Sequence, residues 1–203
     1  MIPEKHLSQL IHMAKRLGAS DAGMIFSADI EINVDLAALC NGDHPCGNYG
    51  LSSSCPPHVP GPSRFQEWQN SSQYSIVVRI DVPSVVMFSD ERHEVMQLLH
   101  EIVAGIELKA VEMGYNGSKA FAGGSCKEIF CREHAACQVI SKHGKCRNPL
   151  YARPSMSGFG INVAKLMQSA GWPVKKQTLE DTSDRESMTW VAGLILLDKL
   201  LKN

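Results

Sequence analysis

The sequence contains neither a long hydrophobic run nor an excess of charge of one sign. No apolar stretch approaches the roughly 20 residues that cross a bilayer, and the opening residues, MIPEKHLSQL, lack the apolar core of a signal peptide. Twenty lysines and arginines nearly balance 21 aspartates and glutamates, for a net charge of −1. We therefore expect a cytoplasmic protein that binds neither membrane nor nucleic acid.

The motifs of several common enzyme classes are also absent. No G-x-G-x-x-G sequence follows a predicted strand, no P-loop lysine is present, and no C-x3-C-x2-C sequence indicates radical-SAM chemistry. Asp43, Glu128 and Glu133 do not form a persuasive acid–base pair. The residues therefore assign no catalytic group and do not decide whether the protein is an enzyme; if it is one, we expect an oxidoreductase.

Cysteine, by contrast, is abundant. Disulfides are rare in the cytoplasm, and an odd number of cysteines cannot all pair. The later cysteines lie among Lys, Arg, Glu, His and Asn rather than on an apolar stripe, which is not typical of core residues. We predict that all seven cysteines bind metal, in a first group of three and a second group of four: Cys40, Cys46 and Cys55, then Cys126, Cys131, Cys137 and Cys146.

Hydrophobic periodicity predicts alternating helices and strands. We expect one α/β domain over residues 1–203, with α+β as the alternative and a mixed sheet flanked by helices. The cysteine segments 40–57 and 122–149 are predicted to be long metal-binding loops outside the sheet. Helices are expected at 4–17, 63–69, 90–113 and 157–171, strands at 22–28, 74–82, 119–123 and 188–198, and one or two helical turns within 131–140.

The spacing of the second group favours an iron–sulfur cluster over a single ion. Its cysteines follow the pattern C-x4-C-x5-C-x8-C. Zinc sites usually contain two tight C-x2-4-C pairs. A cluster binds its thiolates at separate corners and accepts wider spacings, and four thiolates complete one [4Fe–4S] cube. We therefore predict one or two [4Fe–4S] clusters, with zinc as the alternative cofactor.

The first group leaves its fourth ligand undecided. Its last cysteine is followed by two prolines, and a proline directly after a cluster cysteine also occurs in bacterial ferredoxins. His44 or His58 could complete the site. The other interpretation is an open metal position, which is where a substrate or water binds.

Several neighbouring residues are candidates for the surroundings of a cluster. Gly123 and Gly124 could let the backbone approach it and donate N–H groups to its sulfur atoms. Arg147 could offset the negative charge of four thiolates. His134 and His143 are candidate proton donors.

Four sequence segments resemble one protein family. They are CGNYGLSSSCPP (46–57), AGGSCKEIFC (122–131), GKCRNP (144–149) and ARPSMSGFGINV (152–163). Together they are similar to the predicted metal-binding proteins known as domain of unknown function 2284, over roughly residues 16–197. The resemblance implies a cysteine-bound metal centre of the iron–sulfur type. In the last segment we expect Ser155 or Ser157 to cap a helix. The N–H groups of that helix start, and Arg153, are expected to face the anionic cluster or an anionic ligand.

The leading functional hypothesis is an iron–sulfur redox protein. It would pass electrons to an unknown redox partner protein, to a second cluster or to a small-molecule substrate. The first alternative is an enzyme that uses an open iron of the three-cysteine cluster as a Lewis acid or sulfur carrier. The second alternative is a zinc-stabilised binding module without chemistry of its own.

Overall fold

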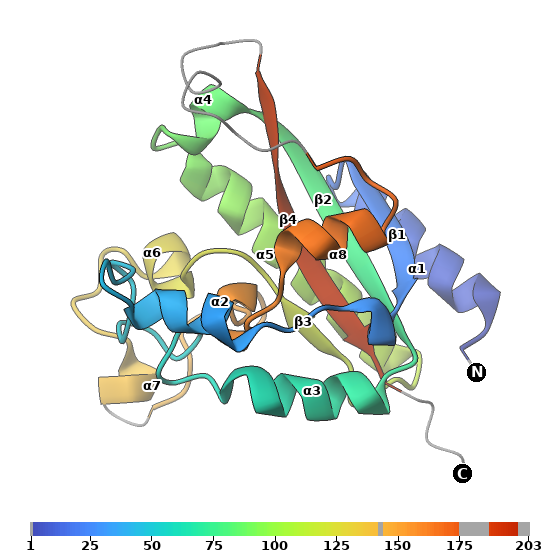
Figure 1. The fold of residues 1–203 in the computed structure, drawn as a ribbon, viewed down its shortest axis with the longest axis horizontal. Helices are drawn as coiled ribbons and strands as arrows, with labels where there is room; N and C mark the ends of the chain where they lie inside the picture. Colours follow the sequence, from blue (N-terminus) through green and yellow to red (C-terminus); the bar gives the residue numbers. More distant parts are fainter. Residues whose placement is uncertain (1, 142–143, 175–186, 199–203) are drawn as a thin grey trace.

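A four-stranded sheet lies at the centre of the molecule. The computed structural model describes residues 2–141, 144–174 and 187–198. The strands are ordered β1-β2-β4-β3, and each neighbouring pair is antiparallel (Figure 1). The prediction of a sheet flanked by helices is confirmed, but the sheet is antiparallel rather than mixed. The strands are β1 Asp21–Phe26, β2 Tyr74–Pro83, β3 Lys119–Phe121 and β4 Met188–Leu197.

The two central strands are apolar because helices cover both of their faces. β2 pairs with β4 over ten residues, with Val77 opposite Leu194. Seven consecutive residues of β4, from Val191 to Leu197, are buried. Strands buried on both faces are near-continuous hydrophobic runs, a pattern more typical of parallel sheets. This explains why the sequence pattern did not show that the pairing is antiparallel.

One face of the sheet is covered by two long helices, α1 (Glu4–Arg16) and α5 (Arg92–Glu112). Both were predicted from the spacing of their apolar residues. Leu10 of α1 and Ile102 and Ile106 of α5 are fully buried and belong to the same core cluster as the side chains on this face of β2 and β4. Their burial anchors α5, whose first turn reaches the cysteine segments.

The other face carries an aromatic core. It is covered by α3 (Gly61–Ser71) and the 3-10 helix η3 (Met156–Phe159), together with α8 (Val163–Ser169). The rings of Phe65, Phe121 and Phe159 pack with centroids 5.0 to 5.9 Å apart. Because η3 begins at Met156, the last residue of the ARPSM segment (residues 152–156), this core fixes that segment against the sheet.

The helix predicted over 157–171 is divided in two. Gly160 has φ +69°, in the left-handed region, and a side chain there would collide with the carbonyl oxygen of Asn33. Asn162, rather than Ser155 or Ser157, caps the helix that follows, because its side chain accepts a hydrogen bond from the N–H of Lys165. The expectation of one continuous helix was therefore wrong. Ser155 occupies the N-cap position of η3, but its side chain makes no capping hydrogen bond there.

The cysteine segments contain short helices and are not simple loops. Figure 1 shows α2 (Val34–Ala38), α6 (Cys126–Phe130) and α7 (Gln138–Ser141) gathered at the end of the molecule away from α1. In the described part of the chain, no helix is both long and apolar enough to cross a membrane. The short helices are η1 Ser27–Asp29, α2 Val34–Ala38, η2 Leu39–Asn41, α4 Ser84–Met87, α6 Cys126–Phe130 and α7 Gln138–Ser141.

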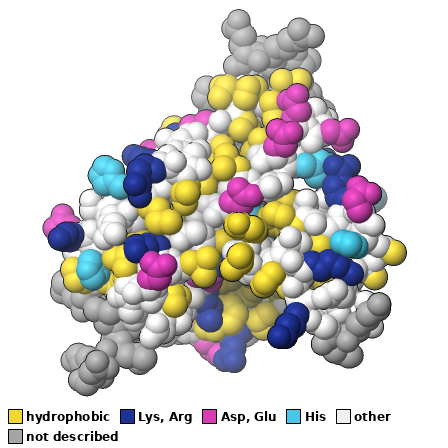
Figure 2. All heavy atoms as spheres, turned by 180° about the vertical axis from the view of Figure 1, so that it is seen from behind, with side chains coloured by type: hydrophobic (Ala, Val, Ile, Leu, Met, Phe, Trp, Pro, Cys, Tyr) yellow, Lys and Arg dark blue, Asp and Glu magenta, His cyan; other side chains and the backbone are white. Residues whose placement is uncertain are grey.

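Charged side chains are mixed over the back of the molecule. Figure 2 shows basic and acidic side chains on this face, interspersed with hydrophobic ones. This distribution agrees with the near-zero net charge of the sequence.

Candidate metal centre

The ARPSM segment joins the two cysteine segments. The N–H of Ala122 donates to the carbonyl of Pro154 at 2.9 Å, and the N–H of Met156 donates to the carbonyl of Ala122 at 3.0 Å. Ser155 then donates its N–H to the carbonyl of Ser54 at 3.1 Å. Ser54 and Ala122, which lie shortly before Cys55 and Cys126, are therefore held close together through this segment, although about 70 positions separate them in the chain.

The four cysteines of the second group line one small cavity of about 20 Å³. α6 begins at the first of them and ends just before the second, and the third directly precedes α7. Lys127 and Arg147 also line this cavity. The structure thus brings together the four thiols that the sequence assigned to one site: Cys126, Cys131, Cys137 and Cys146.

Hydrogen-bond donors surround these four thiols. The backbone N–H and the side-chain amide of Asn148 lie 3.4 Å from the sulfur atoms of Cys146 and Cys131, respectively. Burial acts to raise the pKa of Cys137, but backbone hydrogen bonds from Ser53, Ile140 and Val139 hold that pKa below its usual value. Donors of this kind stabilise a thiolate, which is the form that binds metal.

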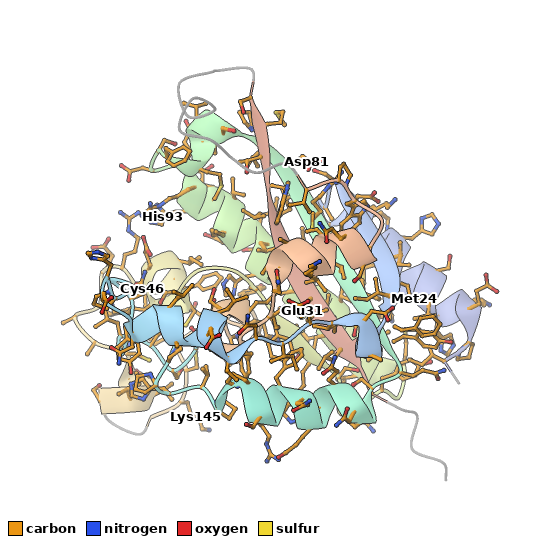
Figure 3. All side chains as sticks on the ribbon, viewed as in Figure 1. Met24, Glu31, Cys46, Asp81, His93 and Lys145 are labelled. Atoms are coloured by element: carbon orange, nitrogen blue, oxygen red, sulfur yellow. The ribbon has the colours of Figure 1, made fainter. Side chains whose placement is uncertain are left out.

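The three cysteines of the first group line a second, much larger cavity of about 480 Å³. Cys40 lies in η2, Cys46 is exposed, and Cys55 is buried. Burial raises the pKa of Cys40, and the nearby charges of Cys46 and Cys55 raise it further, so the three thiols are electrostatic neighbours. Figure 3 shows Cys46 and Lys145 at the same end of the molecule, opposite Met24 of β1.

A chain of buried serine hydroxyls separates the two cavities. The hydroxyl of Ser54 donates to the sulfur of Cys126 at 3.1 Å and lies 4.0 Å from the sulfur of Cys55. The hydroxyl oxygen of Ser52 lies 3.0 Å from that of Ser54 and 3.2 Å from that of Ser125. Sequence reasoning missed these serines, although the SSSC sequence placed three hydroxyls directly before a cysteine.

The cysteine that Ser54 contacts is the most strongly perturbed thiol. Burial raises the pKa of Cys126 to about 11, although hydrogen bonds from Ser54 and Ser52 lower it. The charges of Cys146 and Cys55 raise it further, one from each cavity. Cys126 is therefore a protonated thiol near neutral pH, and a metal that binds it must displace that proton.

The thiols are arranged around cavity walls rather than about one point. All seven are free. Within the described residues, no three Cys, His, Asp or Glu side chains meet closely enough to hold a single metal ion. The donor set of each cavity is nevertheless soft sulfur, which suits iron–sulfur clusters and zinc.

Comparison with known proteins agrees with this donor set. The model of a family described as predicted metal-binding protein (DUF2284) matches residues 23–197. The chain belongs to this family. The predicted resemblance is thereby confirmed, and with it a metal-binding role at the level of the family description. No curated protein and no solved structure matches the chain.

In this DUF2284 protein an acidic residue fastens the first cysteine segment to the helices. The carboxylate of Glu128 accepts hydrogen bonds from Asn48 at 2.8 Å and from Arg92 at 2.8 Å. His93 lies 3.2 Å from the same carboxylate, and Figure 3 shows His93 at the Cys46 end of the molecule. The hydrogen bond from Asn48 is the main reason that the pKa of Glu128 is lowered. Sequence reasoning had given Glu128 no role.

Of the two predicted glycines, one lies beside a cavity. Gly124 has φ +71° and lines the three-cysteine cavity. Gly123 instead packs against Leu99 and Met96 of α5, and its carbonyl lies 3.1 Å from Nε2 of His100. The prediction that both glycines bring the backbone close to a cluster thus has structural support only for Gly124.

Arg147 and Arg153 have different positions. Arg147 lines the four-cysteine cavity, as expected, and donates to the carbonyl of Ala136 at 3.2 Å. Arg153 is buried and donates to the carboxylate of Glu107 at 2.5 Å and to two backbone carbonyls. The predicted position of Arg153 facing the cluster is therefore corrected, because an ion pair beneath the ARPSM segment binds its guanidinium.

Of the histidines considered from the sequence, the three that the structure describes line neither cavity: His44, His58 and His134. Nε2 of His58 lies 3.3 Å from the carbonyl oxygen of Gly50, on the surface. His44 and His134 are exposed. His143 lies outside the described residues.

Proposed function

We propose that this protein is an iron–sulfur redox protein with two [4Fe–4S] clusters, one at each cysteine group. The observation that supports the proposal is the sorting of seven free thiols into two cavities. A bound cluster would supply one-electron transfer. Because a cluster attaches thiolates at separate corners, it suits thiols that are spread around a cavity wall.

The residue types around the four-cysteine cavity suit an electron-transfer site, and its segments must move apart to admit a cube, because the cavity of about 20 Å³ holds about one water molecule. Four thiols provide all the protein ligands of one cube. Lys127 and Arg147 reduce the negative charge of these thiolates, and Asn148 supplies hydrogen-bond donors to two of them. Ser54 lies between a cysteine of each group, so the two sites are adjacent and electrons could pass between them.

The larger cavity supports a second candidate function, that of an enzyme with an open metal position. Three cysteines line a space of about 480 Å³, and its described lining offers no fourth Cys, His, Asp or Glu. Small-molecule pockets typically measure about 300 to 1,000 Å³. A metal bound there would supply a Lewis-acid position, and the cavity would admit a ligand beside it.

Anaerobic purification followed by iron, sulfide and zinc analysis tests the proposal. We expect a brown protein with about eight iron and about eight sulfide per chain, the content of two cubes. About four of each would indicate a single cluster. A colourless protein with stoichiometric zinc and no sulfide would refute the redox function and favour the zinc-stabilised binding module.

A further inference from the structure

We propose that the three-cysteine cavity binds a small uncharged organic ligand that carries a hydroxyl, carbonyl or amide group. This inference rests on the open metal position proposed above and specifies the class of molecule that reaches it. Three features of the cavity lead to it: apolar walls, free hydroxyl groups and a described lining without a cationic side chain.

Apolar side chains form much of the cavity wall. Leu36 and Leu39 lie on one side, in α2 and η2. Val163 is the first residue of α8, and Ile161 lies two positions before it. Burying the apolar part of a ligand against such a wall contributes about 25 cal/mol per Å². The cavity therefore favours molecules with a substantial hydrocarbon part.

Three hydroxyl groups in the lining are available to a ligand. Among the described residues, the side chains of Tyr49, Ser155 and Ser157 have no hydrogen-bond partner. The side-chain amide nitrogens of the two asparagines in the same lining are already engaged, since Asn48 donates to Glu128 and Asn162 donates to Glu31. A ligand hydroxyl, carbonyl or amide would give the free hydroxyls partners and so fix its own orientation.

The larger cavity differs from its neighbour in the charged side chains of its lining. Its described residues include no Lys, Arg, His, Asp or Glu. The four-cysteine cavity, by contrast, is lined by Lys127 and Arg147. An anion in the larger cavity would lose its hydration and lie beside three negative thiolates without a cationic partner, which is strongly unfavourable. The cavity therefore selects against carboxylates and phosphates.

A matched pair of probes tests this selection. Methyl isocyanoacetate is uncharged, whereas isocyanoacetate carries a carboxylate, and both present the same isocyano group to an open iron. Each is titrated into reduced, cluster-loaded protein and followed by electron paramagnetic resonance. We expect the neutral ester to bind at least about tenfold more tightly, because the carboxylate would be buried without a partner.

A charge placed in the cavity should reverse the preference. Ser157 is exposed at the cavity rim, so Ser157→Arg can be introduced without disturbing the core. We expect this variant to tighten binding of isocyanoacetate and reduce the preference for the ester by about tenfold or more. Ser8→Arg, the same change at an exposed position of α1, is the control and should leave the preference unchanged.

The outcomes separate this inference from the proposed function. If iron and sulfide are present but the two probes bind equally, or neither binds, the inference is wrong and the redox proposal stands. The same holds if Ser157→Arg and Ser8→Arg behave alike. If the protein contains no sulfide, the proposed function itself fails.

Discussion

The two cavities place cysteine sulfur, the proposed metal-binding atom in both, in contrasting surroundings. The four-cysteine cavity measures about 20 Å³ and has two cationic side chains in its wall. The three-cysteine cavity measures about 480 Å³ and has no cationic side chain in its described lining. The first arrangement suits a site that only exchanges electrons, and the second suits a site that meets a ligand. The difference indicates a division of labour between two adjacent centres.

Two single variants, each of which removes one thiol from one of the cavities, test that division most severely. We expect Cys137→Ala and Cys46→Ala each to lose about half of the iron and sulfide, because each change destroys one cluster site and leaves the other complete. Metal analysis and the paramagnetic resonance spectrum of the reduced proteins measure this. Each variant should retain a different part of the wild-type spectrum.

Two outcomes would contradict the hypothesis that each cavity holds its own cluster independently of the other. If both variants lose all of their iron, the cavities form one cooperative centre. If Cys46→Ala retains the wild-type iron and sulfide content, the three-cysteine cavity holds no cluster.

The buried ion pair between Arg153 and Glu107 should stabilise the ARPSM segment, which lies between the two cavities. Arg153 and Glu107 are largely buried, and Glu107 also accepts the N–H of Ala120 at 2.8 Å. Arg153→Met leaves a buried carboxylate without its partner, so we expect the free energy of unfolding to fall by about 3 to 5 kcal/mol. Urea unfolding of the wild type and the variant measures the loss.

An exposed ion pair provides the matched control. Arg64 and Glu67 are both more than half exposed on α3. We expect Arg64→Met to cost less than about 1 kcal/mol. Equal losses in the two variants would mean that the buried pair does not hold the segment between the cavities.

His100 should make this junction sensitive to acid. It is fully buried, with Nδ1 accepting the N–H of Arg153 at 3.1 Å, and burial lowers its pKa to about 4. Between pH 6.5 and 4 the unfolded chain therefore binds the proton more readily than the folded chain. The neutral His100 side chain therefore makes its full contribution to the free energy of unfolding above pH 6.5. That contribution is lost as the pH falls toward 4, and the loss is at most about 3 kcal/mol.

Unfolding across this pH range, compared with His100→Gln, isolates the contribution. The variant should be less stable at pH 7 and should lose less stability between pH 6.5 and 4. Parallel pH profiles of the two proteins would rule out this role for His100.

The sequence predicted best those elements whose residues satisfy local rules. The helices at 4–17 and 90–113 and the strand at 74–82 were found because apolar spacing reports directly on burial. The left-handed Gly160 was missed as a helix break because its conformation depends on the close approach of Asn33, which is remote in the chain. Antiparallel pairing was missed for a similar reason, since strand direction depends on connections rather than on composition.

The candidate site shows the same limit. Cysteine spacing predicted two groups of thiols, and the thiols of each group line one cavity. The grouping could be predicted because metal-binding residue types are rare and distinctive. It could not show that Ser54 contacts a thiol 72 positions away, or that Glu107 rather than a cluster holds Arg153. Such partners are common polar residues, and only the three-dimensional contacts distinguish them from exposed ones.

The smallest expected effect concerns the hydroxyl between the two cavities. Ser54 donates a hydrogen bond to the sulfur of Cys126, and such bonds stabilise the more negative, reduced state of a cluster. We expect Ser54→Ala to lower the reduction potential of the four-cysteine cluster with little change in iron content. Redox titration followed by paramagnetic resonance measures the shift, with the exposed Ser71→Ala as control. An unchanged potential would mean that Ser54 separates the two centres without tuning either.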